Sequence, residues 1–379
     1  MDRYEELDRQ LSEHKIQSVR FVRTQTCYPR LHGRNAAKGV HGYGNMIIAA
    51  ELTTDRNVRG WGSAVCAYDP EIPSFPRPEI VGLRVTDIFC SGQGILDGAH
   101  SVYDIALHDL AGKILNLPVS HMLNQQAVSY VNVYDGAIYM NDLIHPPQLL
   151  PLESVIDDCA ADYALGHRAF KIKIGRGFEW LPWEEGFARD VLLVRETARR
   201  WPDAQIMVDA NDGYTPEQMI RFLQSIYPAK LYWIEEPFAE EEKANAQLKE
   251  YLRVGMPGCM LADGENRPDI PKLLGLHQKG LLDVLQPDVV DFGFSKWRAL
   301  MNQLEALGAF GSPHAWGDIV KTYYCAHLAA AYPRHIPTIE AVLGTTEGVD
   351  HSGYTLSNGI LTIPSAPGFG MELFRGETI

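Results

Sequence analysis

The sequence has few basic residues relative to acidic ones, and it contains no long apolar run. Its 34 lysine and arginine residues face 48 aspartate and glutamate residues, which leaves a formal charge of −14. Because phosphate contacts need an excess of positive charge, we expect no nucleic-acid partner and no binding to an anionic membrane surface. No apolar run approaches the roughly 18 residues of a membrane span, and the charged N-terminus does not resemble a signal peptide.

Cysteines are also scarce. There are six, and none forms a CxxC pair or lies near a histidine at the spacing of a zinc finger. We expect buried free thiols, which indicates a reducing compartment, and we predict a cytoplasmic protein. A chain of 379 residues with 46% hydrophobic residues is typical of two folded domains, or of one large domain with additions.

The first 130 residues are predicted to form an α+β domain. Runs rich in β-forming residues occupy 16–23, 46–52 and 60–65, and apolar residues at helical spacing follow at 101–115, where Pro118 ends the pattern. Strands followed by helices favour this class of domain.

Residues 131–350 have a different rhythm. Eight short apolar runs alternate with amphipathic helical stretches, such as 215–227 with Thr215 as N-cap and a capping box to Gln218. The runs are VNVYDGAIYM, AFKIKIG, QIMVDAN, LYWIEEP, CMLADGE, VLQPDVV, AFGSPHA and TIEAV. Eight alternations predict a parallel (β/α)8-type TIM barrel. Residues 351–379 are expected to lie outside the barrel and to pack back on the N-terminal domain.

Ionisable residues recur at the ends of the predicted barrel strands, where the catalytic groups of such barrels lie. From Asp209 onward the spacings are 26, 30, 23, 26 and 26 residues, each about one strand–helix unit. We therefore expect these side chains to converge on one mouth of the barrel: Lys171, Lys173, Asp209, Glu235, Glu265, Asp288, His314 and Glu340.

Three carboxylates, Asp209, Glu235 and Glu265, end neighbouring strands. Their mutual repulsion favours a bound cation, and a set of hard oxygen ligands favours Mg²⁺. The alternative is that each is an ordinary solvated or salt-bridged acid. Asp263 lies two residues before Glu265 and could replace it, whereas Glu236 is expected to point to the opposite face from Glu235.

The basic groups fall into two sets. Lys171 and Lys173 share one face of the second strand, where a neighbouring ammonium and a metal would lower a lysine pKa and make a base. Otherwise they are a structural pair that neutralises the acids. Asp288 can accept a hydrogen bond from His314 and orient it for proton transfer, although a histidine at a strand end is often only hydrogen-bonded.

The ordered motifs KIKIG, MVDAN, YWIEEP, DGEN, QPD, SPH and IEA resemble the enolase superfamily, specifically its mandelate racemase-like group. The segment SVYDIALHDLAGKILNLPV resembles the helix that joins the family's capping domain to its barrel. The resemblance implies that Asp209, Glu235 and Glu265 bind one Mg²⁺. It also implies that the N-terminal domain closes the mouth with a loop within residues 30–44.

The resemblance further implies proton chemistry on both faces of a carboxylate substrate. Lys173 would be the base on one face, tuned by Lys171, and His314, oriented by Asp288, would act from the other. Strand six carries no lysine, which argues against the muconate-lactonising and dipeptide-epimerase reactions. The residues implied to bind the substrate or its developing enolate are Lys171, Asn211 and Glu340.

Abstraction of the α-proton of a carboxylate gives an ene-diolate, which this superfamily stabilises with Mg²⁺. We predict loss of water from a sugar acid to give a 2-keto-3-deoxy acid. A racemase or epimerase of 2-hydroxy acids and a catalytically silent Mg²⁺-binding barrel are the alternatives. A nucleotide enzyme is disfavoured because the glycines of residues 92–98 have the wrong spacing. The resemblance also implies a symmetric homo-oligomer.

Overall fold

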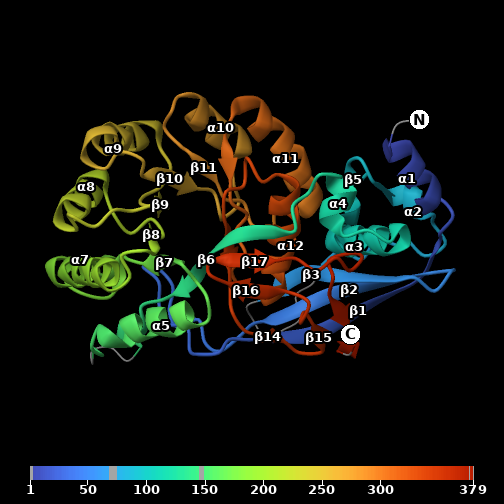
Figure 1. The fold of residues 1–379 in the computed structure, drawn as a ribbon, viewed down its shortest axis with the longest axis horizontal. Helices are drawn as coiled ribbons and strands as arrows, with labels where there is room; N and C mark the ends of the chain where they lie inside the picture. Colours follow the sequence, from blue (N-terminus) through green and yellow to red (C-terminus); the bar gives the residue numbers. More distant parts are fainter. Residues whose placement is uncertain (1–2, 68–74, 145–148, 375, 379) are drawn as a thin grey trace.

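The computed structural model describes residues 3–67, 75–144, 149–374 and 376–378. An N-terminal α+β region lies beside a larger region of alternating strands and helices (Figure 1). Within the described ranges, no helix is both long enough and apolar enough to cross a bilayer.

The N-terminal region is an antiparallel sheet of β1 (Ile16–Cys27), β2 (Met46–Thr54) and β3 (Arg59–Ala67) with helix α3 (Asp104–Leu115) packed on β3. Glycine allows this close approach, because a Cβ at Gly60 would lie 2.4 Å from the backbone of Leu110. The predicted helix over 101–115 begins as the 3-10 turn η1 (Gly98–Tyr103) and continues as α3. The other elements are α1 (Arg3–Leu11), α2 (Val85–Ile88), β4 (Phe89–Cys90), β5 (Gly94–Ile95) and α4 (Val119–Leu123).

The larger region is built on a parallel sheet whose strand order follows the chain from β6 to β12. The eighth strand, β13, pairs in parallel with the first, β6, through Glu340 and Tyr134. Between β12 and β13 no ladder is found in the described part of the chain, and the Gly311 N–H instead donates to the carbonyl of His335, in the segment before β13, at 2.8 Å. The strands are β6 (Tyr130–Ile138), β7 (Ala169–Lys173), β8 (Gln205–Asp209), β9 (Trp233–Glu235), β10 (Met260–Asp263), β11 (Val284–Leu285), β12 (Phe310–Gly311) and β13 (Ile339–Ala341).

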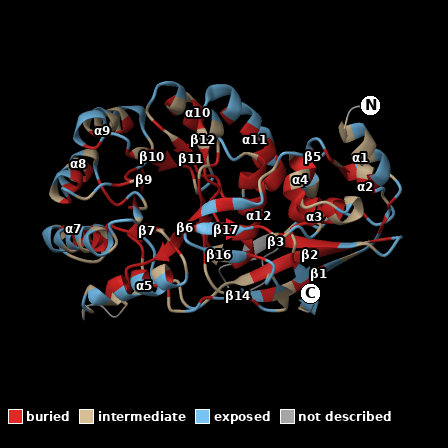
Figure 2. Ribbon diagram, in the orientation of Figure 1, coloured by how far each residue is buried: buried red, intermediate tan, exposed pale blue. Residues whose placement is uncertain are grey.

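Helices follow the strands and form the outer layer around the sheet (Figures 1 and 2). The predicted capping box is confirmed: the Thr215 hydroxyl accepts from the Gln218 N–H at 3.2 Å, and the Gln218 side chain accepts from the Thr215 N–H at 2.8 Å. The elements are η2 (Asn141–Leu143), α5 (Glu153–Ala164), α6 (Arg176–Glu179), α7 (Trp183–Arg200), α8 (Pro216–Ser225), α9 (Glu242–Gly255), α10 (Ile270–Gln278), α11 (Phe294–Leu307) and α12 (Ile319–Ala331).

Strand alternation explains why polar groups are buried inside this sheet. Ala169, Met207, Trp233 and Val284 pack together as one apolar cluster. Side chains two residues further along a strand lie on the same face. The pattern that places Met207 and Trp233 inside therefore also places Asp209 and Glu235 inside, at the carboxyl ends of their strands.

The C-terminal segment contacts both regions. Strand β17 (Ile360–Thr362) pairs with β6 and with β16 (Thr355–Ser357), whereas β14 (Thr345–Thr346) and β19 (Glu377–Thr378) pair with β1. The remaining pair is β15 (Val349–Asp350) with β18 (Glu372–Leu373).

The five cysteines whose side chains are described are all free thiols. Cys159, Cys259 and Cys325 are buried, whereas Cys27 is exposed and Cys90 is half-buried. The expectation of buried thiols is therefore wrong for these last two: Cys27 is the last residue of β1, and Cys90 lies in the two-residue strand β4.

Candidate active site

The three predicted metal ligands converge. Asp209 ends β8, Glu235 ends β9 and Glu265 follows β10, and one carboxylate oxygen from each lies within 4.8 Å of the others. Gln286 donates to the second oxygen of Glu235 at 2.9 Å. The Oε2 atom of Glu265 is buried without a hydrogen bond. The spacing of the strand ends therefore predicted a real cluster.

Two further acids, Asp263 and Glu236, are neighbours of the predicted ligands in sequence. Asp263 is outside the converging group, because Gly264 at φ +109° turns the chain before Glu265 and ends the alternation. Glu236 lies at φ +40°, and its carboxylate accepts from the Asn211 amide at 3.2 Å. The expectation that Glu236 points away from the site is wrong, since the left-handed backbone redirects its side chain.

Lys171 is completely enclosed by acids. Its ammonium donates to Glu235, and it lies 3.0 Å from Glu340 and 3.6 Å from Asp209. Burial by itself would lower the pKa of Lys171, but the attraction of Glu235 and Glu340 outweighs it and raises the pKa well above its usual value. Lys171 is therefore a fixed positive charge that holds the acids together.

Lys173 is two residues after Lys171, at the carboxyl end of β7. Its ammonium donates to Asp209, and to the Asn211 side-chain oxygen at 3.2 Å. Burial would lower the pKa of Lys173, yet Asp209 outweighs burial and raises it, although Lys171 acts in the opposite direction. The protein groups alone therefore do not lower the pKa of Lys173, because the nearest charge is the Asp209 carboxylate.

His314 and Asp288 form the predicted pair. The Nδ1 atom of His314 lies 2.8 Å from Asp288, and its Nε2 atom lies 3.3 Å from the unbonded oxygen of Glu265. Burial would lower the pKa of His314, but Glu265 and Glu340 raise it to about 9. The buried ammonium of Lys321 also bonds to Asp288, at 2.8 Å, and keeps the pKa of that carboxyl low.

Glu340 is held from three directions. It pairs with Lys171, it accepts from the Ala315 N–H at 2.8 Å, and it lies 3.8 Å from His314 Nε2. Burial opposes ionisation, but Lys171 and His314 lower the pKa of Glu340 below its usual value. Gly136 leaves room for it, since a Cβ there would lie 2.1 Å from the Glu340 carboxylate.

These residues fit a divalent cation. The buried carboxylates Asp209, Glu235 and Glu340 and the half-buried Glu265 share two lysines and one histidine, and the Oε2 atom of Glu265 has no hydrogen bond. An all-oxygen donor set of three carboxylates is the kind that Mg²⁺ accepts. The charge deficit and the orphaned oxygen both support a cation at this place.

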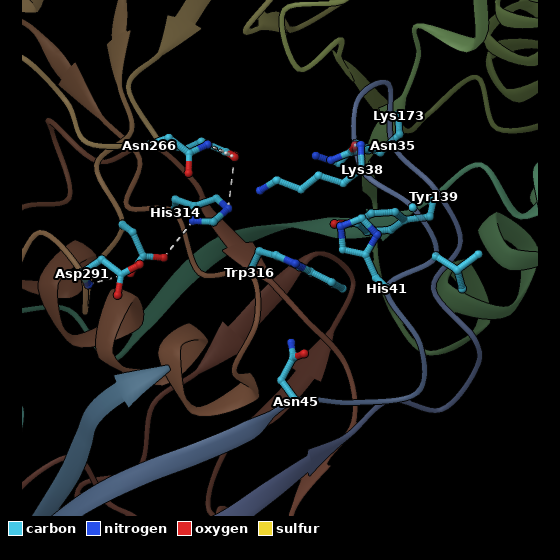
Figure 3. Close-up of a pocket in the computed structure, with 14 residues that line it drawn as sticks. Asn35, Lys38, His41, Asn45, Tyr139, Lys173, Asn266, Asp291, His314 and Trp316 are labelled. Atoms are coloured by element: carbon cyan, nitrogen blue, oxygen red, sulfur yellow. Dashed lines mark hydrogen bonds and ion pairs between the residues drawn. The ribbon is translucent and has the colours of Figure 1, made fainter. Parts of the chain in front are cut away.

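A cavity of about 410 Å³ opens beside this cluster (Figure 3). Sugar-sized ligands occupy cavities of this order. One side of it belongs to the strand ends, and the other belongs to residues 30–44, as predicted. The lining residues are Asn35, Lys38, Gly39, Val40, His41, Asn45, Tyr139, Lys173, Glu265, Asn266, Asp288, Asp291, His314 and Trp316.

Residues 30–44 form what we call the capping hairpin. His32 pairs with Gly42 across it, and Arg34 pairs with Met140 just after β6. The indole of Trp180 donates to the Asn35 carbonyl at 2.7 Å. Trp180 of the segment 175–186 thus supports the hairpin.

Sequence reasoning missed the aromatic wall and one cation. Tyr139 and Trp316 lie with ring centroids 4.8 Å apart, and His41 lies 4.6 Å from Tyr139. Trp316 follows His314 by two residues in the run SPHAWGD, and the period of two in a strand could have predicted that both side chains lie on the same side. Lys321 had no such signal, because its contact with Asp288 depends on how α12 begins.

Sequence comparison gives relatives that act on sugar acids or their derivatives. The chain is 29% identical to the D-galactarolactone cycloisomerase of Agrobacterium fabrum over 86% of this chain and 89% of that protein. It is 24% identical to the arabinonate dehydratase of Saccharolobus solfataricus over 94% of this chain and 97% of that one.

Solved structures give the same picture. A galacturonate dehydratase from a Geobacillus species, complexed with D-galacturonate and 5-keto-4-deoxy-D-galacturonate, has a TM-score of 0.84 and 31% identity over 96% of this chain and 95% of that one. A mandelate racemase/muconate lactonizing protein from Geobacillus, complexed with magnesium and tartrate, has a TM-score of 0.85 and 31% identity over 96% and 94%. The fold is thus an α/β barrel with a capping domain.

The family model for the enolase C-terminal domain-like family matches residues 155–376, which is more than half of the chain. Its relatives are dehydratases and cycloisomerases, and the structures similar to it include complexes with magnesium. The chain therefore belongs to the mandelate racemase-like group of the enolase superfamily, whose enzymes use Mg²⁺.

Proposed function

We propose that this enzyme removes water from a sugar acid to give a 2-keto-3-deoxy acid. One observation carries the proposal: Lys173, at the end of β7, and His314, after β12, line the same cavity, and Figure 3 shows these two residues on opposite sides of it. A substrate between them would meet a proton acceptor on one face and a proton donor on the other.

The carboxylate of the substrate belongs beside Asp209, Glu235 and Glu265, which would hold Mg²⁺. When bound, Mg²⁺ supplies positive charge that withdraws Asp209 from Lys173 and stabilises the negative charge developing on the substrate carboxylate. Lys171 supplies a fixed positive charge from the buried side of the cluster. Together these charges favour the ene-diolate, which carries one more negative charge than the substrate carboxylate from which it forms.

Lys173 would act first. Its Nζ atom, in the neutral form, accepts the α-proton, and the C–H electron pair moves into the carboxylate to form the ene-diolate. Asn211 accepts from this Nζ at 3.2 Å and so fixes its direction. Glu340, next to both Lys171 and His314, would hold a hydroxyl of the enolised substrate.

His314 would complete the elimination. Paired with Asp288, His314 can carry a proton, and its Nε2 would give that proton to the β-hydroxyl as the C–O bond breaks and water leaves. Asp288 holds Nδ1 at 2.8 Å, which directs Nε2 toward the cavity. The resulting enol then takes a proton from solvent to give the keto acid.

The relatives support this chemistry. The ligands in the galacturonate dehydratase structure, D-galacturonate and 5-keto-4-deoxy-D-galacturonate, differ by one water molecule, with the new ketone next to the carboxylate. The D-galactarolactone cycloisomerase supports a second candidate, in which a ring oxygen rather than water leaves the β-carbon. Both reactions begin with the same proton abstraction.

The test is a screen of sugar acids and their lactones with Mg²⁺, read by mass spectrometry, with EDTA controls. A product lighter by one water supports dehydration, and an isomeric keto acid supports cycloisomerisation. Incubation in D₂O separates the remaining alternatives, because an epimerase exchanges the α-proton without forming a keto acid. Absence of both product and exchange from the whole set, with Mg²⁺ bound, would contradict the proposed function.

A further inference from the structure

The capping hairpin presents one positive side chain to the cavity. Lys38 lines the cavity, and Figure 3 shows its amine extending from the hairpin toward His314. No hydrogen-bond or ion-pair partner for this ammonium is found within the described ranges, and its residue is exposed. Lys173, at the inner end of the same cavity, is 4% exposed. The ammonium at the buried end of the cavity, that of Lys173, is therefore paired with a carboxylate, whereas the ammonium of Lys38 on the hairpin is available to a ligand.

The hairpin fixes the position of Lys38 while leaving its side chain free. The Asn35 side-chain oxygen accepts from the Lys38 N–H at 2.6 Å and from the Ala37 N–H at 3.1 Å, which closes a tight turn. The Asn35 N–H donates to the Lys38 carbonyl at 3.2 Å. The backbone of Lys38 is thus held from both sides, and only the four-carbon stem and its charge remain available to a ligand.

The other cations of the cavity already have partners inside the protein. Lys173 pairs with Asp209, and His314 pairs with Asp288 and Glu265. The Nδ1 atom of His41 lies 2.8 Å from the Gly33 carbonyl oxygen. Burial lowers the pKa of His41 to about 4, so that the imidazole is neutral near pH 7. Lys38 is the remaining positive charge among the lining residues, in a chain whose overall field repels anions.

We propose that Lys38 binds an anionic group at the outer end of the substrate, so that the preferred substrates are sugar acids with a second carboxylate. This inference rests on the proposed function, which places the first carboxylate at the buried end beside Asp209, Glu235 and Glu265. The hairpin borders the same cavity, so a substrate held there would extend toward Lys38. A terminal phosphate offers the same negative charge, but the lone lysine suits a carboxylate better than a dianion, which proteins usually bind with several donors.

The experiment compares matched acids on matched variants. Hexaric acids carry a carboxylate where hexonic acids carry a hydroxymethyl group, and 6-phosphogluconate carries a phosphate at the same end. Dissociation constants are measured by calorimetry with Mg²⁺-loaded protein, and kcat/KM is measured for each acid that reacts. The variants are Lys38→Met, Lys38→Arg and Lys38→Glu, with Lys230→Met, an exposed lysine outside the cavity, as the control.

We expect wild type to favour at least one hexaric acid over its matched hexonic acid. Lys38→Met should weaken binding of that hexarate about ten- to a hundred-fold, as expected for loss of a charge-assisted hydrogen bond, and should leave hexonate binding unchanged. Lys38→Arg should restore most of the hexarate affinity, and Lys38→Glu should reverse the preference. Lys230→Met should change neither.

Three results would overturn the inference. Equal losses for hexarates and hexonates would show that Lys38 serves the common carboxylate or the hairpin itself. A wild-type preference for hexonates would show that the outer end takes a neutral group, and a preference for 6-phosphogluconate alone would assign the site to phosphate. Because binding is measured separately from turnover, a Lys38-dependent preference without any product would count against the proposed reaction and not against this site.

Discussion

The barrel mouth and the capping hairpin border one cavity, but they use polar side chains in different ways. At the mouth, most acids and bases are buried and face an opposite charge, as with Lys171 between Glu235 and Glu340. In the hairpin, the polar atoms of Asn35 and His41 bond mainly to its own backbone, and Lys38 extends into the cavity.

This difference separates the proposed roles. A buried set of paired charges keeps its geometry without substrate, which suits groups that must lie within bonding distance of a reacting atom. Because the hairpin is held by backbone hydrogen bonds, one of its side chains can be substituted without disturbing the charges at the mouth. We therefore expect substitutions at the mouth to change the chemical step, and substitutions in the hairpin to change which acid is bound.

The strongest test of the mouth is Lys173→Ala. We expect turnover to fall by about 10²–10⁴-fold or more, because no other neutral base lies where the α-proton would leave. Exchange of that proton with D₂O, followed by NMR, should be lost as well. Mg²⁺ should bind at least as tightly as in wild type, because the ammonium that occupies Asp209 is gone. Undiminished exchange would remove Lys173 from its role.

His314→Asn tests whether the mouth contains two separate proton-transfer groups. Dehydration should fall by about 10²–10⁴-fold, because the β-hydroxyl loses its proton donor. Exchange of the α-proton should persist, since Lys173 is untouched. Measuring both rates on one variant separates the two faces, and a parallel loss of exchange would mean that His314 and not Lys173 removes the α-proton. Asp288→Asn should act in the same direction with a smaller effect.

The sequence predicts the mouth well and the hairpin poorly, for a physical reason. Residues at strand ends are fixed by local rules, since a period of two and the strand–helix repeat bring Asp209 and Glu235 to neighbouring positions. The hairpin could be placed as a segment, but the side chains that reach the cavity depend on long-range bonds. One is the pairing of Arg34 with Met140, more than a hundred residues away.

The same reasoning explains the errors at the mouth. Alternation fails where the backbone becomes left-handed, as at Glu236 and Gly264, and such a turn cannot be read from hydrophobic period alone. Without a metal, the pKa of Lys173 is raised, because Asp209 lies directly opposite it in the ladder between β7 and β8 and outweighs both burial and the neighbouring Lys171.

Comparison of Glu265→Gln with Asp263→Asn tests the ligand assignment where alternation breaks. Glu265→Gln should weaken Mg²⁺ binding by at least about tenfold, a loss that even indirect partners of a metal ligand can cause. Asp263→Asn should leave Mg²⁺ affinity at the wild-type value, because this carboxylate is outside the converging group. Calorimetric titration with MgCl₂ gives both constants, and the reverse order would exchange the two assignments.

The smallest effect is expected behind the hairpin, at Trp180→Phe. The substitution removes the hydrogen bond to the Asn35 carbonyl but keeps an aromatic ring under Arg34, whose guanidinium lies 4.2 Å from the ring centroid. Losing one such bond costs about 1 kcal/mol, which corresponds to roughly a fivefold change in an equilibrium constant. If the hairpin binds substrate without reacting with it, as proposed, this cost should raise KM and leave kcat unchanged.

Trp183→Phe, at the first residue of α7, is the matched control. Trp183 packs against Tyr214 and Phe187, with ring centroids 5.3 Å and 5.6 Å away, and supports α7 rather than the hairpin. It should lower the melting temperature without changing KM. If Trp180→Phe instead lowered kcat as Lys173→Ala does, the hairpin would be part of the chemical machinery, and the division between a reacting mouth and a selecting hairpin would fail.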